Sequence, residues 1–199
     1  MQAALGFQAR TGWAALVAVA GPLDQPVVAD RRRVELVDDE VPAHVYHAAQ
    51  KAGPADAGAL VRKAERTARA LSRTAVRTVA RDLGKAGFEI VGIGLGVAEP
   101  HPPAKLEDVL ASHALVHAAE GELYRHALIR AGESCRLPVA CLPRKALATH
   151  AAKELGLRGI QMQAQLTRMG REIGPPWRQE QKEAALAAWV SLARRWRPR

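Results

Sequence analysis

The chain has 199 residues, of which 48% are hydrophobic and 25% charged, a composition typical of a globular protein and not of a disordered one. We expect a single domain at residues 1–196 with a short basic tail at 194–199. No apolar run is long enough to span a membrane, and 29 Lys and Arg against 20 Asp and Glu leave a net charge of +9, which favours polyanionic partners.

The first part of the chain predicts an antiparallel set of strands. Residues 2–8 and 13–20 are apolar strands joined by a hairpin-sized connection at 9–12. Residues 26–38 alternate apolar and polar side chains toward their end, which predicts a third strand. Three consecutive strands with short links form an antiparallel meander.

The rest of the chain predicts helices that alternate with strands. Gly and Pro punctuation predicts a short helix at 42–51 and a long helix at 57–83. The continuous apolar run at 88–97 is typical of a buried strand. The expected elements that follow are a helix at 105–132, a strand at 137–142 and helices at 144–156 and 178–196. This order predicts an α/β fold with a mixed five-stranded sheet flanked by helices.

Two cysteines, Cys135 and Cys141, are too few for a disulfide framework. They predict reduced thiols that serve as small packing residues, and hence a cytoplasmic protein.

Three segments carry a resemblance to a known family. Gly6-Phe7-Gln8 followed by Thr11-Gly12-Trp13, residues 110–147 and residues 179–192 resemble the first hairpin, a helix–strand unit and the last helix of the RuvC-type Holliday-junction resolvases. The resemblance implies a ribonuclease H-like fold, with DNA or RNA as the partner. Because members of that family are dimeric, it also implies a homodimer.

The catalytic positions depart from that family. In the family, four carboxylates at the ends of the central strands and the start of the last helix hold two metal ions that activate a water. Here Gln8 stands at the place of the first acid, and Gln181 and Ala184 fall nearest the acids of the last helix. The remaining candidates for a rearranged catalytic site are Glu99, Glu180 and Glu183. Mg²⁺ requires hard oxygen ligands, so we expect two-metal cleavage to be lost and Mg²⁺ to bind only if those glutamates form a new site.

Three glycines, Gly92, Gly94 and Gly96, share one face of the predicted strand at 88–97, where the second acid would project. They lack the GxGxxG spacing and the following helix of a nucleotide-binding loop. Close packing of a helix against this face is the favoured interpretation.

Six arginines recur at intervals of three and four in the predicted helix at 57–83 and therefore lie along one side of it. They are Arg62, Arg66, Arg69, Arg73, Arg77 and Arg81. This row is a candidate nucleic-acid interface because arginines in line can pair with successive phosphates, and Arg194 and Arg195 of the tail add further candidates. The alternative is an ordinary solvated helix face.

His113, His117 and Glu120 stand at i, i+4 and i+7 in the predicted helix at 105–132, a spacing that can ligate zinc. Ala114 occupies the position of the glutamate in an HExxH motif, so surface histidines are the competing interpretation. Trp177, before the last helix, either holds that helix to the core or stacks a base.

Three functions remain open from the sequence. The first is a catalytically degenerate ribonuclease H-like domain that binds nucleic acid. The alternatives are a divergent metal-dependent nuclease or resolvase with a rearranged acidic site, and a protein-interaction scaffold that uses the alanine-rich helices.

Overall fold

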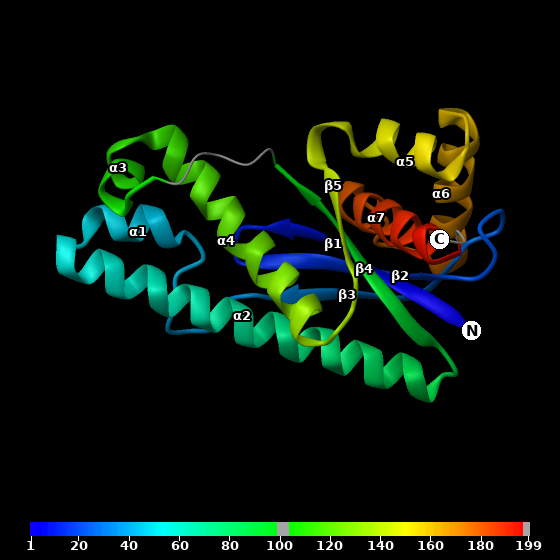
Figure 1. The fold of residues 1–199 in the computed structure, drawn as a ribbon, viewed down its shortest axis with the longest axis horizontal. Helices are drawn as coiled ribbons and strands as arrows, with labels where there is room; N and C mark the ends of the chain where they lie inside the picture. The colour runs from blue at the N-terminus through cyan, green and yellow to red at the C-terminus, as the bar shows by residue number, and fades with distance from the viewer. Residues whose placement is uncertain (99–103, 197–199) are drawn as a thin grey trace.

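The protein is described from a computed structural model, which describes residues 1–98 and 104–196. Its five strands are β1 (Gln2–Arg10), β2 (Trp13–Ala20), β3 (Val27–Glu35), β4 (Glu89–Val97) and β5 (Val139–Pro143). They form one sheet in the order β3-β2-β1-β4-β5 (Figure 1). The β1–β2 and β2–β3 pairs are antiparallel, whereas β4 runs parallel to both β1 and β5. The predicted mixed five-stranded sheet is therefore confirmed.

The helices fall into two groups, one for each face of the sheet (Figure 1). The first group is α1 (Val45–Lys51), α2 (Pro54–Lys85), α3 (Leu106–Ala111) and α4 (His113–Ser134). The second is α5 (Leu147–Leu155), α6 (Gly159–Ile173) and α7 (Gln179–Trp196), with a short 3₁₀ turn, η1 (Arg144–Ala146), after β5. No helix within the described ranges combines the length and apolar character needed to cross a membrane.

Two helical segments differ from the sequence prediction. The expected helix at 105–132 is broken at Ser112, whose extended backbone separates α3 from α4 and whose Oγ accepts a hydrogen bond from the Leu115 amide at 3.4 Å. Serine is a favoured N-cap, because its hydroxyl satisfies an amide that has no partner in the first turn. Helix α6 was not predicted, although its buried residues Met162, Leu166 and Met169 follow a helical period.

The alternation of side chains along β1 supplies two separate cores. Leu5 and Phe7 belong to the core covered by α2 and α4, whereas Ala4 belongs to the core covered by α7. Gly6 and Gln8 therefore face α7, the helix that packs across β1, β2 and β4. This places Gln8, 3% exposed, beneath the last helix of the chain.

Glycines allow α7 to approach the sheet more closely than a side chain would permit. A Cβ at Gly6 would lie 1.8 Å from the Ala184 carbonyl oxygen, and one at Gly94 would lie 2.0 Å from that of Ala187. Gly6 and Gly94 are neighbours in the parallel pairing of β1 with β4. The close-packing interpretation of the β4 glycines is confirmed at this position.

The segment that leads into α7 is fixed to the rest of the fold. The Arg31 guanidinium of β3 donates hydrogen bonds to the carbonyl oxygens of Gly174, Pro175 and Pro176 at 2.7, 3.0 and 2.6 Å. Trp177 Nε1 donates to the Leu166 carbonyl oxygen at 2.9 Å, and its ring packs against the α7-side core. Trp177 therefore holds this end of α7 to the core, as one of the two sequence interpretations predicted.

Candidate functional site

The end of β1 and the start of α7 meet at one edge of the sheet, where the family resemblance implies a cluster of acids. Arg10, the last residue of β1, reaches across this edge and pairs with Glu180 of α7, with 3.3 Å between Nη2 and Oε1. Because Gln8 precedes Arg10 by two residues, both side chains project from the same face of the strand. The carboxylate of Glu180, the first candidate acid of α7, is therefore already paired with the Arg10 guanidinium.

The other candidate acids, Glu183 and Glu99, have different standing in the structure. Glu183 accepts a hydrogen bond from Gln179 Nε2 at 2.9 Å. Glu99 lies outside the described residues. The described groups of His, Cys, Asp and Glu that could hold a metal ion contain neither Glu180 nor Glu183. Protein sites bind Mg²⁺ chiefly through carboxylates, whereas Gln8 offers a neutral amide oxygen and the Glu180 carboxylate is already paired with Arg10.

A small cavity of about 190 Å³ lies beside the end of β1 and is lined by three arginines from three different elements. They are Arg10 of β1, Arg125 of α4 and Arg144 of η1. The sequence interpretation named none of these residues, because an isolated arginine in an alanine-rich helix gives no sign of what faces it. The tertiary structure alone brings the three guanidinium groups together.

Arg125 is the unusual member of this set, because it is 7% exposed. Burial, and then the like charge of Arg144, lower the pKa of its guanidinium from the ordinary value. The charge of Glu122 acts in the opposite direction as a smaller contribution, and the Glu120 carboxylate lines the same cavity, although Arg125 makes no direct ion pair among the described residues. Burying a cation is costly, and an anion in the cavity would offset part of that cost. We refer to this cavity, lined by Arg10, Arg125 and Arg144, as the arginine cavity.

The arginine row of α2 is exposed along its whole length. The opposite face of the helix is buried through Val61, Ala64, Ala68, Val76 and Val79. Leu71 and Ala75, which we expected on that face, are partly buried. Two arginines of the row have an acidic neighbour: Arg69 lies 3.6 Å from Glu65, and Arg81 lies 3.5 Å from Asp82.

Part of the row borders a groove between α2 and α4. Arg66, Arg69 and Arg73 of α2 line this groove of about 290 Å³ together with Arg130 of α4. Arg130 pairs with Glu133 at 2.9 Å on the exposed surface. We refer to this groove, lined by these four arginines, as the arginine groove.

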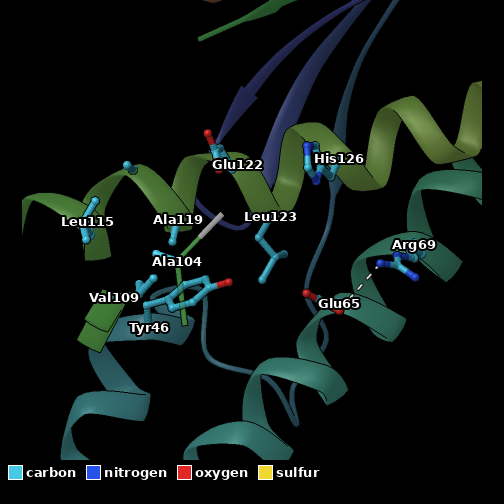
Figure 2. A pocket seen from close by; sticks show the side chains of 11 residues that line it. Tyr46, Glu65, Arg69, Ala104, Val109, Leu115, Ala119, Glu122, Leu123 and His126 are labelled. Atoms are coloured by element: carbon cyan, nitrogen blue, oxygen red, sulfur yellow. Dashed lines mark ion pairs between the residues drawn. The ribbon is translucent and has the colours of Figure 1, made fainter. Parts of the chain in front are cut away.

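A neighbouring cavity of about 380 Å³ lies between α4 and the helices α1 and α2 (Figure 2). The Glu65–Arg69 pair and His126 stand at one end of it, and Leu115, Val109 and Tyr46 lie toward the other (Figure 2). Burial raises the pKa of the Tyr46 hydroxyl to about 12. The hydroxyl therefore stays protonated at neutral pH and cannot act as a base. The cavity adds a partly apolar wall next to the arginine groove.

The sequence grouped Glu120 with His113 and His117, whereas in the described groups that could hold a metal ion Glu120 stands with His44 and His47. His113 and His117 lie side by side on α4, with 3.0 Å between their Nε2 atoms. The buried Glu120 carboxylate instead accepts hydrogen bonds from the backbone amides of Val45, Tyr46 and His47, at 3.1, 2.9 and 3.2 Å. Glu120 therefore satisfies the open N-terminal amides of α1.

The two tail arginines differ in their surroundings. Arg194 pairs with Glu154 of α5, and Arg194, followed by His150, lowers the pKa of the Glu154 carboxyl to about 2. Arg195 is exposed, and residues 197–199 lie outside the described part of the chain. Arg194 thus has a structural partner within the fold.

Comparison with known proteins gives similarity at the level of fold. No family model and no curated protein sequence matches the chain. Among solved structures, Thermus thermophilus RuvC in complex with a Holliday junction substrate aligns with a TM-score of 0.57 and 13% identity, over 98% of this chain and 96% of that one. A second structure of Thermus thermophilus RuvC aligns with a TM-score of 0.53 and 12% identity, over 97% and 96%. The protein therefore has the ribonuclease H-like fold and is distantly similar to RuvC over nearly its whole length.

Proposed function

We propose that this protein binds nucleic acid through phosphate contacts and lacks two-metal cleavage. The observation that carries the proposal is the arginine cavity at the end of β1. This cavity is lined by three guanidinium groups and one carboxylate, Glu120, so arginines outnumber acids in its wall. An excess of positive charge attracts phosphate directly and does not need a bound cation to do so.

Arg125 supports an anion as the ligand of this cavity. Arginine stays charged at all ordinary pH values, so burial does not remove its need for a counter-charge. A phosphate offers several acceptor oxygens, and guanidinium–phosphate hydrogen bonds are among the stronger ones in proteins. Arg10 differs from the other two because it already pairs with Glu180. Arg125 and Arg144 are therefore the residues expected to hold the anion.

The arginine groove and the rest of the α2 row would supply further phosphate contacts. Residues 62 to 81 of a helix span about 28 Å, which is about the length of eight base pairs of duplex. Arg66, Arg73 and Arg77 have no acidic partner in the described part of the chain. Unpaired arginines along this length would release counterions from a nucleic acid backbone.

Branched DNA is a suitable first probe, because one of the similar structures is that of RuvC with a Holliday junction substrate. Binding of a labelled four-way junction, a DNA duplex and an RNA duplex would be measured by fluorescence anisotropy over a range of salt concentrations. We expect affinity to fall steeply with salt for at least one of these probes. Absent binding, or binding that does not depend on salt, would overturn the proposal.

Variants connect that binding to the two arginine sites. Arg66→Ala with Arg73→Ala tests the groove, and Arg144→Ala with Arg125→Gln tests the cavity. Each lost phosphate contact should reduce the slope of log affinity against log salt by about 1. Arg171→Ala is the matched control, because Arg171 is an exposed arginine on α6, which belongs to the other helical layer. Equal losses in all variants would point to net charge alone and argue against these two sites.

A further inference from the structure

Four histidines and one buried glutamate meet where α1 lies against the start of α4. His44 and His47 come from the α1 end, and His113 and His117 come from two successive turns of α4. The ring centroids of His113 and His117 are 4.4 Å apart, and those of His47 and His117 are 4.8 Å apart. One nitrogen from each of His47, His113 and His117 can be chosen so that all three lie within 4.8 Å of one another.

Glu120 orients the histidine that comes from α1. Its Oε1 lies 3.1 Å from His47 Nδ1, and the side chain of Glu120 is 4% exposed. The same oxygen also accepts the backbone amides of Tyr46 and His47, so the carboxylate is held in place. A carboxylate that accepts the Nδ1 proton leaves Nε2 of the same ring as a lone-pair donor, which is the usual support for a metal-binding histidine. His47 is thereby prepared to bind through Nε2.

The two α4 histidines complete a three-nitrogen set. Their Nε2 atoms face each other at 3.0 Å, a separation at which two neutral lone pairs repel unless a proton or a cation lies between them. Both residues are exposed, so an ion can reach them and a water or other ligand can occupy a further coordination position. Three imidazoles with one open position are a common zinc arrangement.

We propose that His47, His113 and His117 bind a divalent transition-metal ion of the zinc class, with Glu120 as the residue that positions His47. Imidazole nitrogen suits Zn²⁺, Cu²⁺ and Ni²⁺, whereas Mg²⁺ and Ca²⁺ prefer oxygen. The sequence alone identified two of these ligands and assigned Glu120 as the third. The third imidazole comes from a helix more than sixty residues earlier in the chain, and the fold brings it into place.

This site does not depend on the proposed nucleic-acid binding. The ion would link α1 to α4, so its direct effect is to hold these two helices together. His117 also lines the arginine cavity, together with His44 and Glu120. Metal binding and anion binding can therefore be measured on the same protein as separate properties.

The test uses the full chain without a polyhistidine tag, since such a tag binds zinc itself. Competition for Zn²⁺ against a chromophoric chelator gives the stoichiometry and the affinity. We expect one tightly bound Zn²⁺ per chain, no competition from excess Mg²⁺, and an increase in thermal midpoint when Zn²⁺ is added. Co²⁺ offers a second readout, because its visible absorption bands report nitrogen coordination.

Variants decide whether these histidines are the ligands. His113→Ala with His117→Ala, and separately His47→Ala, should weaken Zn²⁺ binding by about 100-fold or more and abolish the Co²⁺ bands. His126→Ala is the matched control, because His126 is an exposed histidine of the same helix outside the group. Circular dichroism of the metal-free variants verifies that they are folded. The proposal is overturned if the wild-type chain takes up no Zn²⁺, or if the His126 variant loses as much affinity as the others.

Discussion

Gly6 of β1 lies directly against the backbone of Ala184 in α7, so closely that a Cβ at position 6 would stand 1.8 Å from the Ala184 carbonyl oxygen. The obstacle is backbone and not a flexible side chain, so α7 cannot make room without leaving the sheet. Close seating of α7 on the sheet therefore requires glycine at position 6.

Gly6→Ala is expected to lower the free energy of unfolding by about 3 kcal/mol, because it forces α7 away from β1. Urea denaturation followed by circular dichroism measures the change. Gly84→Ala is the control, since no atom lies within 4 Å of a Cβ built at Gly84, near the C-terminal end of α2. That substitution should be neutral or stabilising by up to about 1 kcal/mol. Equal stability of the two variants would contradict the close approach of α7.

Glu120→Ala is expected to cost about 2 to 3 kcal/mol of stability, because three backbone amides of α1 lose their shared acceptor. Hydrogen exchange supplies the local readout: the amides of Val45, Tyr46 and His47 should exchange faster while those of the central strands remain protected. Glu107→Ala, at an exposed position of α3, serves as the comparison. Unchanged exchange at α1 would show that the carboxylate does not cap this helix.

The Arg194–Glu154 pair predicts a pH-dependent contribution to stability. Arg194 lowers the pKa of Glu154 from its ordinary 4.5 to about 2 in the folded protein. A lowered carboxyl pKa stabilises the fold above the unfolded value and is lost as pH falls through the folded value. Arg194→Ala should therefore cost about 1 kcal/mol at pH 7, after allowance for solvent screening, and almost nothing near pH 2.

The exposed neighbour Arg195 provides the control for that experiment. Arg195→Ala should leave the stability unchanged at every pH, because the described part of the chain records no ion pair for this residue. Denaturant midpoints at several pH values separate the two variants. A constant cost of Arg194→Ala between pH 7 and pH 2 would argue against the ion pair as its source.

No nicking of a four-way junction is expected with Mg²⁺ or Mn²⁺, because Gln8 supplies an amide and Glu180 is paired with Arg10. Denaturing gels with protein in excess over labelled junction measure the reaction. Metal-dependent cleavage that Glu183→Gln or Glu99→Gln abolishes would establish the alternative function, a divergent nuclease with a rearranged site. Cleavage that both variants retain would indicate a contaminating nuclease.

Local patterns were sufficient for most of the fold. The hairpin of β1 and β2, the long α2 helix and the buried β4 strand each follow from the period of apolar residues and from Gly or Pro at their ends. Ser112 shows the limit, since an N-cap within a helical pattern looks like any other polar residue until its backbone is seen to be extended. Helix α6 was not predicted, although its buried residues Met162, Leu166 and Met169 recur at helical spacing, because exposed residues stand between them.

The sequence by itself determined the order of the five strands, the arginine row along one side of α2 and the amide at Gln8, because each depends on residue identity or on periodicity within one segment. The tertiary structure alone decided which distant residues meet. Arg125 faces Arg144, and His47 joins His113 and His117, because helices from separate parts of the chain pack against one sheet at angles that no local period encodes. The same packing places Glu120, a candidate ligand from its spacing with His113 and His117, against the amides of α1 and the ring of His47.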